Sequence, residues 1–425
     1  MSVRREPPIR REPSVRRKRS VRRDAVAVLL ACAVGGGATA LSTPAHGDAA
    51  GPVAAEERAV PRLVLPAPTG PHAVGRGTLH LVDPDRRDPW VPRAGARELR
   101  VALYYPARAG TGRPAPYLTR AEARAFLDSR DLDLPARVLS STRTHVRADA
   151  RPAPGRFPLV VLSPGFSVPG ATLTGLAADL TSRGYVVAVV DHAYEAAGVE
   201  FPGRGVLPCA ACGKVDDTTF PSAARGRAED LALTLDELTG AASPWPYARL
   251  IDRHRVGAAG HSLGGAASAA TMARDPRVRA VANLDGPFVT SGGGSALPRR
   301  PLLMMGTAAD HAPGGRDTSW ETVWRRHAGW KRWTTVTGAD HFSFTDLGPL
   351  AGQLGEDDPR GLPGKRAGEI TRAYVAAFFD RHLRGRHRPL LDGPSAAHPE
   401  VTFPHATGQA AQPGRRPAEG TGRAG

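Results

Sequence analysis

A serine flanked by glycines is the feature of the sequence that most clearly points to chemistry. Ser262 lies in the segment Gly-His-Ser-Leu-Gly at 260–264, between an apolar run and an alanine-rich stretch. A strand before such a serine and a helix after it hold the residue on a sharp turn, where the glycines avoid steric clashes. The first amides of the helix can then stabilise a developing negative charge. The sequence therefore predicts Ser262 as a nucleophile.

A serine hydroxyl needs a base to remove its proton, and histidine suits that task near neutral pH. Known hydrolases with a serine on such a turn carry the acid and then the base later in the chain, so this resemblance implies a late base. His341 lies in the loop after the last expected strand, which is the place for the base. The competing late histidines occupy less suitable positions: 311, 327, 382, 387, 398 and 405. We predict His341 as the base and expect His261 to pack or hydrogen-bond locally.

Two aspartates are candidates for the acid that orients this base. Asp285 directly follows the apolar run 278–284, and Asp310 follows the next run. Either carboxylate would lie at the carboxyl edge of a parallel sheet, where it could fix the imidazole and stabilise its charged form. Spacing alone does not choose between them.

The tetrahedral intermediate of ester cleavage needs at least two amide donors aimed at its oxyanion. We predict the amide of Leu263 as one donor, because it follows the nucleophile. The amide of Phe166 is the second, in the early loop Ser-Pro-Gly-Phe at 163–166. Because side chains and water supply all of this chemistry, we expect no metal and no organic cofactor.

The elements that must position these residues can be read from short apolar runs that alternate with longer amphipathic stretches. Strands are expected at 99–105, 157–162, 185–190, 255–259, 278–284, 302–305 and 332–336. Helices are expected at 171–183, 223–238, 263–273, 319–327 and 365–383. Runs that are apolar on both faces are typical of parallel strands covered on each side. The pattern predicts an α/β fold, a mostly parallel twisted sheet with helices on both faces.

The two ends of the chain differ in composition from this central region. We interpret 1–47 as a signal peptide, 48–95 as a linker and irregular leading segment, 96–385 as the catalytic domain and 386–425 as a disordered tail. The basic start and the short apolar stretch 25–40 predict export to the medium or the cell envelope, with no transmembrane span after cleavage. Arg22-Arg23 would fit a twin-arginine signal, and a lipid anchor on Cys32 is the less favoured alternative.

The formal net charge of +16 does not indicate a nucleic-acid-binding protein. Residues 1–24 contribute +7 of it, and the rest is scattered as single arginines without interleaved aromatic residues. Only Cys209 and Cys212 remain beyond the predicted signal, and we interpret this pair as a local disulfide or two thiols in a loop.

Residues 97–385 resemble the platelet-activating factor acetylhydrolase-like branch of the α/β-hydrolases, which lies near cutinase-like polyester hydrolases. The resemblance rests on SPGF at 163–166, GHSLGG at 260–265, NLDG at 283–286 and DHFSFTD at 340–346. In the acetylhydrolase branch the acid maps to Asp285, and in cutinase-like relatives it maps to Asp310. The fuller match of the last two motifs favours Asp285. His192 and Tyr194 follow a strand at the same edge and are candidates to line the substrate pocket.

The sequence thus predicts a serine hydrolase that cleaves carboxylic esters, either short-chain acyl esters or acetyl-phospholipid-like substrates, through an acyl-enzyme. A cutinase-like polyester hydrolase is the alternative within enzymes. From another class, a non-catalytic cell-wall-associated binding protein on a hydrolase scaffold is also considered. The expected partner is a small-molecule or lipid ester, and the oligomeric state is not predicted.

Overall fold

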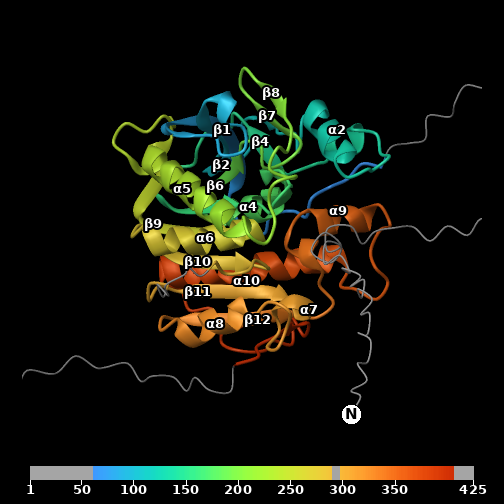
Figure 1. The fold of residues 1–425 in the computed structure, drawn as a ribbon, viewed down its shortest axis with the longest axis vertical. Coiled ribbons are helices and arrows are strands. Elements are labelled where there is room, and N and C mark those ends of the chain that lie inside the picture. Colours follow the sequence, from blue (N-terminus) through green and yellow to red (C-terminus); the bar gives the residue numbers. More distant parts are fainter. Residues whose placement is uncertain (1–60, 290–296, 406–425) are drawn as a thin grey trace, which may run out of the picture. The chain divides into compact units, whose positions relative to one another are not determined.

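The fold is known from a computed structural model that describes residues 61–289 and 297–405 (Figure 1). The signal peptide predicted over 1–47 lies outside the described residues. Within them, eleven strands form one sheet in the order β13-β12-β11-β10-β9-β5-β6-β2-β1-β4-β3. The six strands from β12 to β6 in this order are parallel to one another, and β2 runs antiparallel to β6.

The bounds of the elements follow the alternation expected from the sequence. The sheet strands are β1 (Ala73–Arg87), β2 (Ala96–Ala107), β3 (Arg113–Pro114), β4 (Val146–Ala148), β5 (Phe157–Ser163), β6 (Val186–His192), β9 (Ile251–His261), β10 (Val278–Leu284), β11 (Leu302–Thr307), β12 (Lys331–Val336) and β13 (Val401–Thr402). A separate hairpin joins β7 (Val199–Phe201) and β8 (Gly205–Leu207). The α-helices are α2 (Arg120–Asp128), α3 (Arg137–Ser140), α4 (Thr174–Ser182), α5 (Phe220–Thr239), α6 (Leu263–Arg274), α7 (Ala308–His311), α8 (Ser319–Arg326), α9 (Leu347–Gln353) and α10 (Gly364–Arg384).

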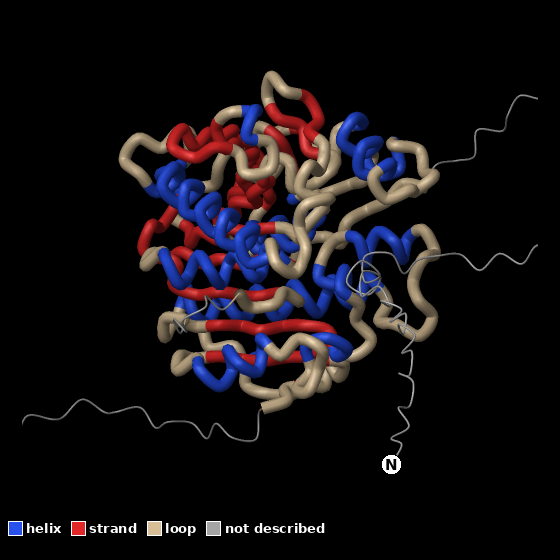
Figure 2. The backbone as a smooth tube through the Cα atoms, viewed as in Figure 1, coloured by secondary structure: helices blue, strands red, loops and turns tan. Residues whose placement is uncertain are grey.

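Both faces of the parallel strands are buried, as their continuous apolar runs predict. In β5, Val160 and Leu162 pack into a core with residues of α4 and α10. Their neighbours Leu159 and Val161 pack into a second core with residues of α5, α6 and α8. Successive side chains of a strand point to opposite faces, so one strand feeds both cores. Figure 2 shows the strands as one layer between helices, and the predicted α/β fold is confirmed.

The prediction of an irregular segment over 48–95 is wrong for residues 73–87. They form β1, which pairs with β2 from Ala73 opposite Ala107 to Arg87 opposite Ala96. This strand lies toward the edge of the sheet and is only partly buried. A strand with one solvated face does not need a continuous apolar run. The sequence of β1 contains glycine, arginine and histidine, and the pattern of apolar runs therefore did not predict this strand.

The predicted disordered tail over 386–425 is also wrong in part, because residues 386–405 are folded. Leu391 and Val401 are almost completely buried, and β13 pairs antiparallel with β12. Arg366 of α10 forms an ion pair with Glu400 at 2.8 Å. These few contacts hold residues 386–405 on the domain, although their average composition is typical of a disordered tail.

The parallel strands end at the same edge of the sheet. Their last residues include Ser163 of β5, His261 of β9, Leu284 of β10 and Val336 of β12. The loops that follow them carry the predicted catalytic residues. In open α/β sheets, ligands bind outside the carboxyl ends of the strands.

Candidate active site

Ser262 occupies a strained turn between β9 and α6. Its backbone has φ 55° and ψ −122°, a conformation that non-glycine residues rarely adopt. The Ser262 amide donates to the carbonyl oxygen of Leu284 at 2.8 Å. A Cβ atom at Gly264 would collide with the carbonyl oxygen of Ser163, so only glycine allows this approach. The predicted arrangement of strand, serine and helix is present, and it exposes the serine at the carboxyl edge of the sheet.

His341 and Asp285 are direct neighbours in the structure. The Nδ1 atom of His341 donates to Oδ2 of Asp285 at 2.6 Å. His341 opens a short 3-10 helix, His341–Phe344, after β12, and the preceding Asp340 caps this helix by accepting from the amide of Ser343 at 2.8 Å. His261 donates from Nε2 to the carbonyl oxygen of His341 at 2.7 Å. The residue before the nucleophile therefore holds the loop that carries the predicted base.

Asp285 lies on a tight turn that the motif NLDG builds. Its φ is 55°, and the side chain of Asn283 closes the turn with two hydrogen bonds to the backbone of Gly286, at 2.8 and 3.0 Å. A Cβ at Gly286 would collide with the carbonyl oxygen of Ser262. Burial alone would raise the pKa of Asp285, but hydrogen bonds from His311 and His341 and their charges lower it well below the usual range. The carboxylate is therefore ionised wherever the protein is folded near neutral pH.

Asp310, the other candidate acid, lies elsewhere. It belongs to the short helix α7, and its partly exposed carboxylate pairs with Arg316 at 2.6 Å. Its amide donates to the side chain of Thr307 at 3.4 Å. The structure thus brings Asp285, and not Asp310, into contact with His341.

In the proposed reaction a proton would move from the Ser262 hydroxyl to Nε2 of His341, and both atoms are free of other hydrogen bonds among the described residues. Within residues 61–289 and 297–405, neither the Ser262 hydroxyl nor Nε2 of His341 has a hydrogen-bond partner. His341 packs on His261, the neighbour of Ser262, with ring centroids 4.5 Å apart. Catalytic hydrogen bonds commonly tighten only when substrate binds. Because Nδ1 donates to Asp285, Nε2 is the nitrogen that can accept a proton.

Of the two predicted oxyanion donors, Leu263 directly follows the serine and Phe166 lies in the loop after β5. Leu263 is the first residue of α6, and Phe166 follows the end of β5. Neither amide donates a hydrogen bond to another described residue. The side chains of Leu263 and Phe166 belong to one cluster, together with Phe220 and Val289. The side chains of the two predicted donor residues therefore pack in one cluster.

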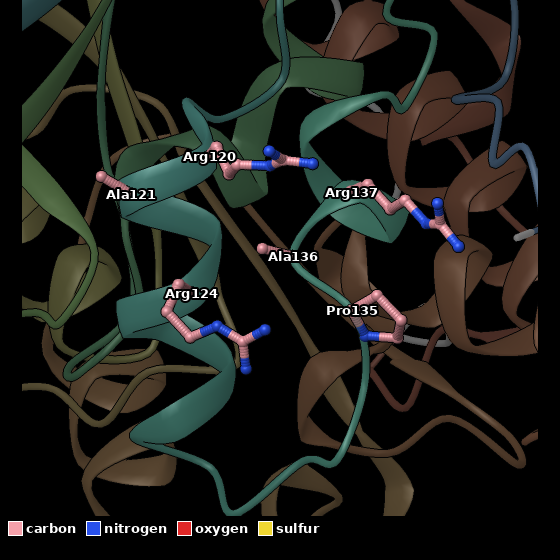
Figure 3. A pocket seen from close by; sticks show the side chains of 6 residues that line it. All are labelled: Arg120, Ala121, Arg124, Pro135, Ala136 and Arg137. Carbon is pink, nitrogen blue, oxygen red and sulfur yellow. The ribbon is translucent and has the colours of Figure 1, made fainter. Parts of the chain in front are cut away.

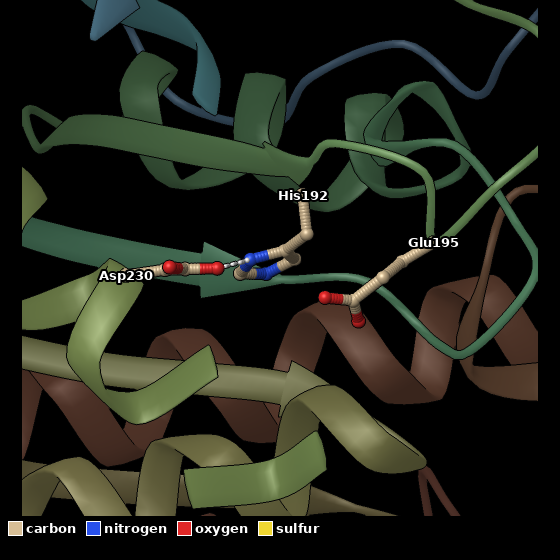
Figure 4. A group of neighbouring side chains, drawn as sticks. All are labelled: His192, Glu195 and Asp230. Atoms are coloured by element: carbon tan, nitrogen blue, oxygen red, sulfur yellow. Dashed lines mark hydrogen bonds and ion pairs between the residues drawn. The ribbon is translucent and has the colours of Figure 1, made fainter. Parts of the chain in front are cut away.

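His192, which the sequence analysis expected as a candidate to line the substrate pocket, is buried in the structure. Its ring is fully buried, and Nδ1 donates to Asp230 at 2.7 Å (Figure 4). Its Nε2 accepts from the hydroxyl of Ser163 at 3.0 Å. Burial and the charge of Arg227 lower its pKa, so the ring is neutral. Tyr194 is half-buried and packs against the hairpin of β7 and β8. Sequence reasoning had no signal that a polar side chain after β6 turns inward.

A buried ion network surrounds His192 and supports the loop that carries Phe166. Arg97 pairs with Asp88 at 2.9 Å, Glu195 at 2.5 Å and Asp230 at 2.7 Å. Arg227 pairs with Glu195 at 2.7 Å and donates to the carbonyl oxygen of Pro164 at 2.5 Å. Burial would raise the pKa of Glu195, but the two guanidinium groups lower it to about 2. The sequence analysis missed this network.

The same network contains ligand types that could bind a metal ion, since donor atoms of His192, Glu195 and Asp230 all lie within 4.8 Å of one another. Their oxygens already bind the buried cations Arg97 and Arg227. A further cation would face these guanidinium charges at short range. These residues therefore fit an ion network and do not fit a metal site.

One cavity of the structure lies apart from the predicted catalytic residues. It has a volume of about 670 Å³ and lies between α2 and α3, lined by Arg120, Ala121, Arg124, Pro135, Ala136 and Arg137 (Figure 3). None of the predicted catalytic residues lines it.

In the described part of the chain, no helix combines the length and the apolar character that crossing a membrane requires.

Comparisons with known proteins agree with this geometry. The model of the family "Platelet-activating factor acetylhydrolase, isoform II" matches residues 59–202. A probable 1-alkyl-2-acetylglycerophosphocholine esterase of Arthroderma benhamiae is 27% identical over 382 residues, which cover 80% of this chain and 94% of that protein. The platelet-activating factor acetylhydrolase of Cavia porcellus is 22% identical over 258 residues, covering 54% of this chain and 58% of that protein.

A solved structure is more similar in sequence. It is the ferulic acid esterase from Streptomyces cinnamoneus, which is 45% identical, with a TM-score of 0.72 over 80% of this chain and 99% of that chain. The fold, the resemblance of the motifs and these relatives all point to the same class, the carboxylic ester hydrolases. The chain belongs to the platelet-activating factor acetylhydrolase-like esterases of the α/β-hydrolase superfamily, and it is a carboxylic ester hydrolase.

Proposed function

We propose that the chain cleaves esters through an acyl-enzyme on Ser262, with His341 as the base and Asp285 as the acid that orients it. The observation that carries the proposal is the hydrogen bond of 2.6 Å between His341 and Asp285, beside a serine on a strained turn. Asp285 fixes the tautomer of His341, so that Nε2 faces the reaction as an acceptor.

In the first half of the reaction, Ser262 Oγ attacks the ester carbonyl carbon and His341 Nε2 takes the hydroxyl proton. The amides of Phe166 and Leu263 donate to the resulting oxyanion. As the tetrahedral intermediate collapses, the bond to the alcohol breaks and His341 returns the proton to the alcohol oxygen. In the second half, His341 removes a proton from water, the hydroxide oxygen attacks the acyl carbon, and Ser262 leaves with the proton.

The proposed substrates are esters with a short acyl group, including acetyl-phospholipid-like molecules. Support comes from the family match and from the printed activity of the Arthroderma relative, an esterase of an acetylated glycerophosphocholine. Esters of ferulic acid are a second candidate, which the identity of 45% to a ferulic acid esterase favours. The two substrate classes differ in the acyl group, which is an acetyl group in one and an aromatic propenoyl group in the other.

The test is a comparison of kcat/KM across p-nitrophenyl esters of increasing acyl length, an acetylated glycerophosphocholine analogue and methyl ferulate. The proposal expects the acetyl substrates to be the fastest, and the second candidate expects methyl ferulate to be so. A polyester film is included, since release of soluble monomers would support the cutinase-like alternative. Ser262→Ala is the matched control, and turnover of any substrate that survives in this variant would refute the mechanism.

We also propose that the protein is exported. The basic residues of 1–24 and the apolar stretch 25–40 support this proposal, as does the bond between Cys209 and Cys212, because disulfides persist in oxidising compartments. The test is the amino-terminal sequence of the mature protein from the culture medium and the cell envelope. Export predicts a chain that begins near residue 48, and an intact chain found only in the cytoplasm would contradict it.

A further inference from the structure

Asp285 binds two histidines, one at each carboxylate oxygen. Oδ2 accepts from His341, and Oδ1 accepts from Nδ1 of His311 at 2.6 Å. The amide of Thr307 also donates to Oδ1, at 2.7 Å. His311 is buried at the end of α7, just beyond β11. The carboxylate that orients the proposed base is therefore shared with a second imidazole.

The other nitrogen of His311 also faces a carboxylate. Nε2 lies 3.1 Å from Oδ2 of Asp317, in the loop before α8. A neutral imidazole has one N–H, so it can donate to only one of two carboxylates, whereas an imidazolium donates to both. Burial would lower the pKa of His311, but the hydrogen bonds and charges of Asp285 and Asp317 raise it to about 9. The ring is therefore a cation over the neutral pH range.

Two tryptophans hold this ring in place. His311 stacks on Trp320 with ring centroids 4.2 Å apart and an angle of 26°. The indole N–H of Trp320 donates to the carbonyl oxygen of Gly286 at 2.8 Å, which ties it to the turn that carries Asp285. The indole N–H of Trp333 donates to the carbonyl oxygen of His311 at 2.7 Å. The ring and the acid thus belong to one rigid assembly.

We propose that His311 is a positioning residue of the esterase. As an imidazolium, it holds the carboxylate of Asp285 in place, and its positive charge partly compensates the negative charge that Asp285 presents to His341. This inference rests on the proposed function of Asp285 and His341. A cation beside the carboxylate weakens the attraction of Asp285 for a positive charge on the ring of His341. We therefore expect the pH dependence of the activity to change when the charge of His311 is removed.

The charges around this pair are few. His311 faces Asp285 beyond β10 and Asp317 before α8, while α8 and β12 present the uncharged Trp320 and Trp333. His341 faces Asp285 and His261. Burial and the charge of His341 lower the pKa of His261 to about 3, so it is neutral. Thus His311 is the cation that reaches the acid within the described residues.

The main test is the pH profile of kcat/KM for an activated short-chain ester with the purified full chain. His311→Asn retains a donor to Asp285 and loses the charge. We expect the midpoint of its acid limb to move to higher pH by on the order of one unit, with KM unchanged within about twofold. Asp317→Asn should shift the limb in the same direction and by less. Asp310→Asn, one residue before His311, is the control and should leave the midpoint in place.

A merely structural role for His311 predicts lower activity at every pH with no shift of the midpoint. That result in a folded His311→Asn protein would overturn the proposal. An independent readout is the nitrogen NMR spectrum of the histidines in the Ser262→Ala protein at pH 7.5. The proposal expects the signals of one buried histidine with both nitrogens protonated. These signals should be missing from the spectrum of His311→Asn. A neutral His311 would overturn the proposal, even if the His311→Asn protein does not fold. If Ser262→Ala keeps full turnover, the proposed function fails, while the spectrum still reports the charge of His311.

Discussion

His261 donates a hydrogen bond of 2.7 Å from Nε2 to the carbonyl oxygen of His341. The strand that presents the nucleophile therefore also holds the loop of the base, across 80 residues of chain. The Nδ1 atom of His261 is buried and has no hydrogen-bond partner among the described residues. Nε2 of His261 thus positions the loop of His341, and the neutral ring of His261 adds no charge to the site.

Replacing His261 by phenylalanine should lower kcat about tenfold, because it removes one hydrogen bond and leaves the His341 carbonyl oxygen without a donor. His261→Gln retains a donor at a similar place and should stay within about threefold of the natural protein. Steady-state kinetics on a short-chain p-nitrophenyl ester, with circular dichroism to check folding, measures both. Equal losses in the two folded variants would show that the hydrogen bond does not matter.

Asp285→Asn should reduce kcat by about 10⁴, since an asparagine amide can hold His341 in the wrong tautomer and cannot stabilise its charged form. Asp310→Asn should change kcat less than about twofold, because its carboxylate pairs with Arg316. Single-turnover rates of the two variants provide the comparison. A large loss in Asp310→Asn with normal activity in Asp285→Asn would reverse the assignment.

Much of the fold could be predicted because the parallel strands are buried on both faces and read as apolar runs. The bounds expected for β10, 278–284, agree with the structure. β1 was missed because one face near the sheet edge stays solvated, and its 15 residues carry no such run. Likewise, the burial of Leu391 and Val401 depends on partners that the local sequence does not contain.

The site could be predicted where a turn leaves a local pattern. Glycines mark the approach of Ser262 to β5, and Asn283 marks the turn of Asp285. His311 appeared only as a competing base, because its two carboxylate partners become visible only when β10 and β11 pair. The buried network was hidden for a similar reason. Arg97 and Asp230 are 133 positions apart, and each alone resembles an ordinary surface charge.

Arg227→Met should lower the free energy of unfolding by about 3–5 kcal/mol, because it leaves the buried Glu195 without one of its cations. Adding Glu195→Gln should restore part of this loss, since the uncompensated charge is then gone. Arg225→Met, on the exposed side of the same helix, is the control and should stay within about 0.5 kcal/mol. Urea unfolding of the natural protein, the single variants Arg227→Met and Glu195→Gln, their double variant and the control Arg225→Met measures the coupling. Strictly additive losses would contradict a direct interaction between Arg227 and Glu195.

The free energy of unfolding should fall as the pH rises from 6.5 to 9. The pKa of His311 is raised from 6.5 to about 9 in the folded state, so its contribution is complete below 6.5 and is lost as the pH passes 9. This rise of the pKa corresponds to about 3 kcal/mol. Urea unfolding at pH 6.5 and 9 tests this, and the decrease should be smaller in His311→Asn. Part of it should remain, because burial raises the pKa of Asp346 to about 8 in the folded state. An identical decrease in His311→Asn would contradict the assignment to this residue.

The central claim is that Ser262 is the nucleophile, and covalent labelling tests it most directly. A fluorophosphonate reacts with a serine that a neighbouring base activates, and mass spectrometry of the digested protein locates the adduct. We predict one adduct per chain, on the peptide that contains Ser262, together with loss of esterase activity. Ser262→Ala should be neither labelled nor active, and His341→Asn should be labelled far more slowly. An adduct on another serine, or turnover that survives in Ser262→Ala, would contradict the account.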